Sequence, residues 1–131
     1  MTAPPRGPHS ADQFTATRDH WWNDDYFEHV ARRLGIGACR NVLELGAGVG
    51  HWTARLLAMC SPDARVTVVD REPDWVGRLR ERFSGEPRVT IVCADATALP
   101  ELPGDFDLVS CQTLLLHIAD VPALLRAMKA L

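Results

Sequence analysis

The chain has 131 residues, of which 47% are hydrophobic and 24% charged, and a formal net charge of −3 at pH 7. This length is enough for one globular domain, and the slightly acidic balance argues against a basic surface for nucleic acid or anionic membranes. The longest apolar runs are far shorter than the roughly 20 residues of a membrane span. We therefore expect a soluble, cytoplasmic protein with no nucleic-acid or membrane partner.

The N-terminal segment 1–18 contains several prolines and lacks the apolar core of a signal peptide. We expect a disordered tail over residues 1–18 and one folded domain over residues 19–131. Within the domain, the first predicted helix has apolar residues at helical spacing and ends at two glycines. These residues are Phe27, Val30 and Leu34, followed by Gly35 and Gly37.

Four short apolar runs follow, at residues 41–45, 65–69, 88–92 and 106–110. Each run is nearly continuous in hydrophobicity, which is typical of strands that are covered on both faces. Helical patterns separate the first three runs and follow the fourth, and Asp120 is a favourable N-cap for the last helix. The residues expected to be buried on these helices are Trp52, Leu56 and Met59; Val76, Leu79 and Phe83; and Val121, Leu125 and Met128.

This alternation predicts an α/β fold with a doubly wound parallel sheet of strand order 3-2-1-4. Ligands of such sheets bind at the carboxyl ends of the strands, where the strand order reverses. The four cysteines lack the CxxC spacing of a metal site, so we expect them to fill the core rather than form disulfides or bind metal. They are Cys39, Cys60, Cys93 and Cys111.

The first strand runs directly into a loop with three glycines at alternate positions, Gly46, Gly48 and Gly50. A strand that ends in such a loop and then enters a helix is expected to present bare backbone N–H groups to a ligand. The dinucleotide-binding pattern G-x-G-x-x-G would need a glycine where this chain has His51. An acidic residue, Glu44, lies two positions before the first glycine.

Acidic residues also follow the next two strands. Asp70 closes the second run, 20 residues beyond Gly50, and Asp95 follows the third. A carboxylate at the end of the second strand can accept hydrogen bonds from both hydroxyls of a ribose, a device that NAD-binding proteins share. The fourth run leads to Gln112 and Thr113 at the predicted switch point, and we expect the next three residues, Leu114, Leu115 and Leu116, to pack in the core.

In this order, the four motifs resemble the nucleoside-binding half of a class I S-adenosylmethionine-dependent methyltransferase. The resemblance implies S-adenosylmethionine as cofactor and S-adenosylhomocysteine as product. It implies that Glu44 orients the cofactor's carboxylate or ammonium group and that Asp70 binds the ribose. It further implies that Asp95 accepts the adenine amino group. The complete set of cofactor contacts that we expect is Glu44, Gly46, Ala47, Gly48, Gly50, Asp70, Arg71, Ala94, Asp95, Ala96, Gln112, Thr113 and Tyr26.

Two of the candidate residues have competing interpretations. Tyr26 belongs to an aromatic N-terminal segment and could cover the methyl-donor end of the cofactor by attraction between a sulfonium and a π face. Plain packing of that helix on the sheet is the alternative. His117, beyond the fourth strand, could act as a general base on the methyl acceptor, or it could brace the loop.

The expected reaction is transfer of a methyl group to an oxygen, nitrogen or carbon nucleophile of a small molecule. Residues 111–114 lack the Asp-Pro-Pro-Tyr signature associated with amide or base methylation. Two alternatives stay open: a cofactor-binding protein without turnover, and an NAD(P)-dependent oxidoreductase. The resemblance also implies a fifth strand, which this chain lacks. We therefore expect a C-terminally truncated domain whose fourth strand has an open edge that can self-associate.

Overall fold

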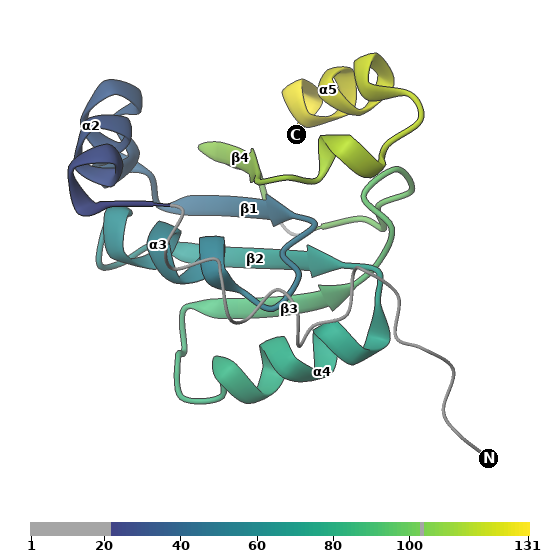
Figure 1. The fold of residues 1–131 in the computed structure, drawn as a ribbon, viewed down its shortest axis with the longest axis horizontal. Coiled ribbons are helices and arrows are strands. Elements are labelled where there is room, and N and C mark those ends of the chain that lie inside the picture. Colours follow the sequence, from purple (N-terminus) through teal and green to yellow (C-terminus); the bar gives the residue numbers. More distant parts are fainter. Residues whose placement is uncertain (1–21, 103) are drawn as a thin grey trace.

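The computed structural model describes residues 22–102 and 104–131 (Figure 1). The predicted tail and the predicted domain start at residue 19 lie outside these residues. The elements in chain order are α2 (Asp24–Leu34), the 3-10 helix η2 (Ile36–Ala38), β1 (Asn41–Leu45), α3 (His51–Met59), β2 (Arg65–Asp70), α4 (Pro73–Arg82), β3 (Val89–Cys93), β4 (Leu108–Cys111), the 3-10 helix η3 (Leu115–His117) and α5 (Val121–Ala130).

The four strands form one parallel sheet in the order β3-β2-β1-β4, which confirms the predicted topology. Glu44 on β1 stands opposite Val68 on β2 and Ser110 on β4. Figure 1 shows the arrowheads of β1, β2 and β3 pointing to the same side. The carboxyl ends of the strands therefore share one edge of the sheet, and the strand order reverses between β1 and β4.

Alternate residues along the strands build two hydrophobic clusters on opposite faces of the sheet. On one face, Val42, Val66 and Val68 pack with Leu56 of α3 and Leu79 of α4. The other face carries a second cluster under α5: Leu43, Leu45, Val69 and Leu124. This burial on both faces explains why the strands read as continuous apolar runs.

Capping residues define the ends of α2 and the start of α5. The side chain of Asn23 accepts a hydrogen bond from the N–H of Tyr26 at 2.8 Å and caps α2, which ends at Gly35 in the left-handed region with φ 65°. Asp120 accepts from the N–H of Ala123 at 2.9 Å, so its predicted role as the N-cap of α5 is confirmed.

Three predicted core residues are in fact exposed. Leu34 is 64% exposed because α2 ends there and buries Phe27 instead. On α5 the fully buried residue is Leu124, whereas Leu125 is 47% exposed. Adjacent helical residues point about 100° apart, so burial of Leu124 turns Leu125 outwards. Leu116, also expected to pack, is 82% exposed on η3.

The fourth strand begins two residues later than predicted. Asp107 lies before β4, and its Oδ2 accepts hydrogen bonds from the N–H groups of Arg40 and Asn41 at 2.7 and 2.9 Å. These bonds lower the pKa of the Asp107 carboxyl. The Asp107 side chain therefore holds the start of β1, while its backbone N–H donates to the carbonyl of Asn41 at 2.8 Å.

The cysteines are free thiols with different surroundings. Cys60 is buried and Cys39 and Cys111 are partly buried, as expected of core residues, but Cys93 is exposed. Burial raises the pKa of the Cys60 thiol to about 11, and the nearby Cys39 adds to this shift. Within the described residues, no group of three His, Cys, Asp or Glu side chains could hold a metal ion. None of the described helices combines the length and apolar character needed to cross a membrane.

Candidate cofactor-binding site

The glycine-rich loop joins β1 to α3 at the carboxyl edge of the sheet. Gly46, Gly48 and Gly50 have φ values of 69°, 59° and 89°, in the left-handed region that favours glycine. A Cβ at Gly46 would stand 2.7 Å from Leu114 Cδ1, and one at Gly50 would stand 2.5 Å from a ring carbon of Phe83. A Cβ at Gly48 would only reach ordinary contact with Trp75, at 3.7 Å. At Gly46 and Gly50, glycine is therefore required for two reasons: the backbone has a positive φ, and a neighbouring side chain leaves no space for a Cβ.

The expectation of bare loop N–H groups is wrong for four residues of the loop, because the protein itself supplies their acceptors. Gly46 and Ala47 donate to the carbonyl of Val69 at 2.8 and 3.1 Å, Gly48 donates to Asp70 Oδ2 at 2.8 Å, and Gly50 donates to the carbonyl of Ala47 at 3.1 Å. The loop is braced on the end of β2. It presents a shaped backbone surface without side chains at its glycines, not a row of open donors.

Asp70 ties this loop to the start of α4. Its side chain is buried, with Oδ2 accepting from the N–H of Gly48 and Oδ1 accepting from the N–H of Glu72 at 2.9 Å. The sequence predicted a carboxylate at this place, and the structure adds that its oxygens hold two backbone segments. Arg71, the next residue, has a side chain that is 62% exposed, with Nη1 3.9 Å from Asp95 Oδ2.

Glu44 lies beneath the loop and is 1% exposed. Its Oε2 accepts a hydrogen bond from Thr53 Oγ1 of α3 at 2.5 Å. Burial raises the pKa of Glu44, the hydrogen bond from Thr53 opposes this shift and the charge of Asp70 adds to it, and together they give a pKa of about 7. The structure therefore places a proton-sensitive carboxyl group behind the loop, with almost no exposed surface.

Asp95 stands on the turn after β3, at the same edge of the sheet. Its Oδ1 accepts from the N–H and the hydroxyl of Thr97 at 2.8 and 2.7 Å. These bonds lower the pKa of Asp95, and the charge of Arg71 contributes. The neighbouring Ala94 and Ala96 are partly buried, and the N–H of Ala94 donates to the carbonyl of Asp70 at 3.0 Å. Asp95 is thus an ionised, partly exposed carboxylate beside Arg71.

Gln112 and Thr113 follow β4 where the strand order reverses, beside the glycine-rich loop. Thr113 has φ 61° and is the only described non-glycine residue with a positive φ. Its hydroxyl donates to the carbonyl of Gln112 at 2.7 Å. A β-branched residue in this region is strained, and such strain is concentrated at functional sites.

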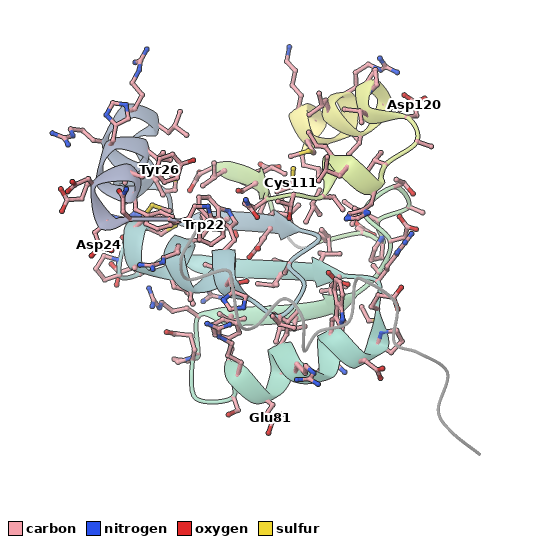
Figure 2. The ribbon with its side chains drawn as sticks, viewed as in Figure 1. Trp22, Asp24, Tyr26, Glu81, Cys111 and Asp120 are labelled. Carbon is pink, nitrogen blue, oxygen red and sulfur yellow. The ribbon has the colours of Figure 1, made fainter. Side chains whose placement is uncertain are left out.

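Tyr26 lies on α2, and His117 lies at the end of η3. Figure 2 shows the Tyr26 side chain on α2, at the opposite side of the view from Asp120. Tyr26 is 49% exposed and makes an edge-to-face contact with Phe27 at 5.5 Å between ring centroids. His117 is exposed at the end of η3, where its N–H donates to the carbonyl of Leu114 at 2.9 Å. Their roles toward cofactor and acceptor stay predictions.

Sequence reasoning missed the contacts by which four residues shape the candidate site. Thr53 binds Glu44, Trp75 flanks Gly48, Leu114 packs on Gly46, and Trp52 Nε1 donates to Ser110 Oγ at 2.8 Å. Only Thr53 had a local signal, because a hydroxyl in the first turn of the helix faces back to the strand that precedes it. The other three contacts depend on how helices and loops far apart in sequence pack together.

Comparison with known proteins agrees with this geometry. Residues 42–131 match the family model described as a methyltransferase domain. The crystal structure of a SAM-dependent methyltransferase from Aquifex aeolicus matches the fold with a TM-score of 0.68 at 19% identity, covering 79% of this chain and 56% of that one. The chain therefore belongs to the class I S-adenosylmethionine-dependent methyltransferase family, whose cofactor is S-adenosylmethionine. This confirms the predicted family, fold and cofactor.

Among individual relatives, a ubiquinone biosynthesis O-methyltransferase of Xanthomonas euvesicatoria pv. vesicatoria is 31% identical over 134 residues, which cover 92% of this chain and 54% of that protein. A ribosomal RNA small subunit methyltransferase A of a Synechococcus species is 36% identical over 97 residues, which cover 73% and 34%. The chain thus spans between about a third and a half of the length of these relatives.

Proposed function

We propose that this chain binds S-adenosylmethionine across the carboxyl ends of β1, β2, β3 and β4, and that the protein transfers the methyl group to an oxygen, nitrogen or carbon atom of a small molecule. One observation carries the proposal. The glycine-rich loop, the buried carboxylate of Asp70 and the strained Thr113 lie at the carboxyl ends of β1, β2 and β4, three neighbouring strands, in a chain of the methyltransferase family.

The residues present fit the chemistry of this cofactor. S-adenosylmethionine carries an ammonium and a sulfonium, and two buried carboxyl groups, Glu44 and Asp70, lie at the loop. The oxygens of Asp70 each accept one backbone N–H and have a further lone pair for a ribose hydroxyl. Glu44 acts from behind the loop through its charge, since almost none of its surface is exposed.

We assign the other contacts by their place at the same edge. The backbone surface of Gly46, Ala47, Gly48 and Gly50 receives the methionine part, and Arg71 lines the ribose side. Ala94, Asp95 and Ala96 receive the adenine, while Gln112 and Thr113 line the switch point between β1 and β4. Tyr26 is the weakest member of the set, because the contact observed for its ring is with Phe27.

The sulfonium supplies an activated methyl group, so the main task of the protein is to bind and align the reactants and to exclude water. The braced loop suits this task because its backbone is already fixed by the carbonyl of Val69 and the carboxylate of Asp70. A general base is needed only for an acceptor that must lose a proton, and His117 is our candidate for that role.

A small-molecule acceptor is supported by two observations: the net charge of −3, and the O-methyltransferase relative that aligns with 92% of the chain. The ribosomal RNA methyltransferase among the relatives supports RNA as a second candidate acceptor. Filter-binding with labelled S-adenosylmethionine separates the two, since RNA would retain the label on the filter and a small phenol or amine would not.

The first test is a thermal melt of the chain with S-adenosylhomocysteine, using NADH as the control ligand. At about 100 times its Kd, a ligand adds roughly 2.7 kcal/mol to the stability of a protein that binds it only when folded. We expect a rise in Tm with S-adenosylhomocysteine alone. A cooperative melt that neither ligand shifts would refute the proposed site. Binding without methyl transfer to any acceptor would favour the cofactor-binding alternative without turnover.

A further inference from the structure

Thr113 and Leu114 form a turn that is held in a strained shape. Thr113 is β-branched, yet it has φ 61°, a left-handed conformation that is unfavourable for such residues. Strain of this kind persists only where the surrounding structure over-determines the backbone. The next residue, Leu114, lies against the glycine-rich loop at Gly46.

Leu114 fills the space that a side chain at Gly46 would need. A Cβ at Gly46 would lie 2.7 Å from Leu114 Cδ1 and 3.1 Å from both its Cβ and Cγ. Leu114 also packs against the buried cluster of Leu43, Leu45, Val69 and Leu124. One side chain therefore joins the glycine-rich loop to the segment after β4, across 68 positions of sequence.

We infer that Leu114 is a positioning residue for the cofactor site, which locks the Gln112–Thr113 segment onto the glycine-rich loop at Gly46. The inference rests on the proposed function, because both joined segments contribute contacts to the proposed site. The left-handed turn at Thr113 directs Leu114 towards Gly46, and the missing side chain at Gly46 lets Leu114 approach. Neither feature is needed simply to bury a leucine in the second cluster, where Leu115 is also partly buried.

Substitutions that add a methyl group at position 46 and remove side-chain atoms at position 114 test this contact. Gly46→Ala places a methyl group against Leu114, so we expect it to weaken binding of S-adenosylhomocysteine about tenfold, equivalent to about 1.4 kcal/mol. Leu114→Ala removes the lock and should weaken binding by a similar factor. In the double variant the clash with Cδ1 and Cγ of Leu114 is relieved, although the left-handed backbone at residue 46 still disfavours alanine, so the combined loss of binding should be clearly smaller than the product of the two single losses. Multiplication of the two losses in the double variant would overturn the inference.

Leu115→Ala is the matched control, because it removes the same atoms from the neighbouring residue of the same cluster. We expect this variant to lower Tm while leaving the Kd for S-adenosylhomocysteine within about twofold of the parent value. If Leu114→Ala behaves in the same way, Leu114 only fills the core and the inference fails. Leu114→Met, which conserves volume, should retain binding within about threefold.

Hydrogen exchange of the ligand-free chain gives a readout that does not depend on the proposed function. Leu114→Ala should speed amide exchange in two separate peptides, one covering residues 46–50 and one covering residues 112–114, while Leu115→Ala should not. This comparison also decides the inference if Gly46→Ala fails to fold or if the parent chain binds no S-adenosylhomocysteine. Unchanged exchange at residues 46–50 in Leu114→Ala would overturn the lock.

Discussion

At the scale of single residues, Glu44 is the group whose chemistry the fold changes most clearly. Its pKa is about 7 in the folded chain, against an ordinary value of 4.5, because burial disfavours the charged form. Between these two values the folded chain holds a proton that the unfolded chain has released. The free energy of unfolding should therefore decrease as pH rises from about 4.5 to 7, by on the order of 2–3 kcal/mol from this group.

Glu44→Gln should remove that part of the pH dependence, since an amide does not titrate and still accepts the hydrogen bond from Thr53. Urea unfolding of both proteins at several pH values between 4.5 and 8 measures the difference. Glu101→Gln, which neutralises an exposed carboxylate, is the control and should keep the parent slope. Parallel curves for the parent chain and Glu44→Gln would show that Glu44 is already ionised in the folded chain at low pH.

At the scale of elements, the capping of α5 by Asp120 gives a direct prediction. Asp120→Ala removes the hydrogen bond to the N–H of Ala123, and loss of such a cap costs about 1 kcal/mol. Urea unfolding should show this loss, and Asp120→Asn should restore most of it because asparagine caps equally well. Equal stability of the alanine variant and the parent chain would mean that α5 contributes little to the cooperative unit.

The strands and α5 also show how much of the secondary structure could be predicted from the sequence. Continuous apolar runs located all four strands to within two residues, because burial on both faces leaves no polar alternation to blur them. The start of β4 was predicted two residues too early. An apolar run does not reveal that the Asp107 side chain binds the N–H groups of Arg40 and Asn41, which are far away in sequence. The buried face of α5 was misjudged by one residue, Leu124 instead of Leu125, since both leucines fit an apolar stripe.

In the candidate site, too, some features follow from local sequence and others depend on contacts between distant segments. Glycines and acids at strand ends are local patterns, so the sequence alone could propose Gly46, Glu44 and Asp70 as site residues. The acceptors of the loop N–H groups and the contact between Leu114 and Gly46 could not be predicted, because they depend on β2 and the β4 turn folding against the loop. Chemistry that belongs to one segment could be predicted, whereas chemistry shared by two segments needed the structure.

At the scale of the whole molecule, the sheet order leaves β3 and β4 as the outer strands of the described chain. Within residues 22–102 and 104–131, β4 pairs only with β1, and its residues are partly exposed although three of the four are apolar or cysteine. An apolar strand with unpaired backbone groups is a template for pairing with another chain. This arrangement supports the prediction that the 131-residue chain self-associates through β4.

Sedimentation velocity over a wide range of protein concentration measures this directly. We expect the average mass to rise with concentration, because pairing of two β4 edges is bimolecular. Amide exchange identifies the surface involved: protection should increase at residues 108–111 in the associated form and stay unchanged at residues 89–93 of the other outer strand. A single monomeric species at every concentration would contradict the prediction. Association with protection at β3 instead would assign the contact to the opposite edge of the sheet.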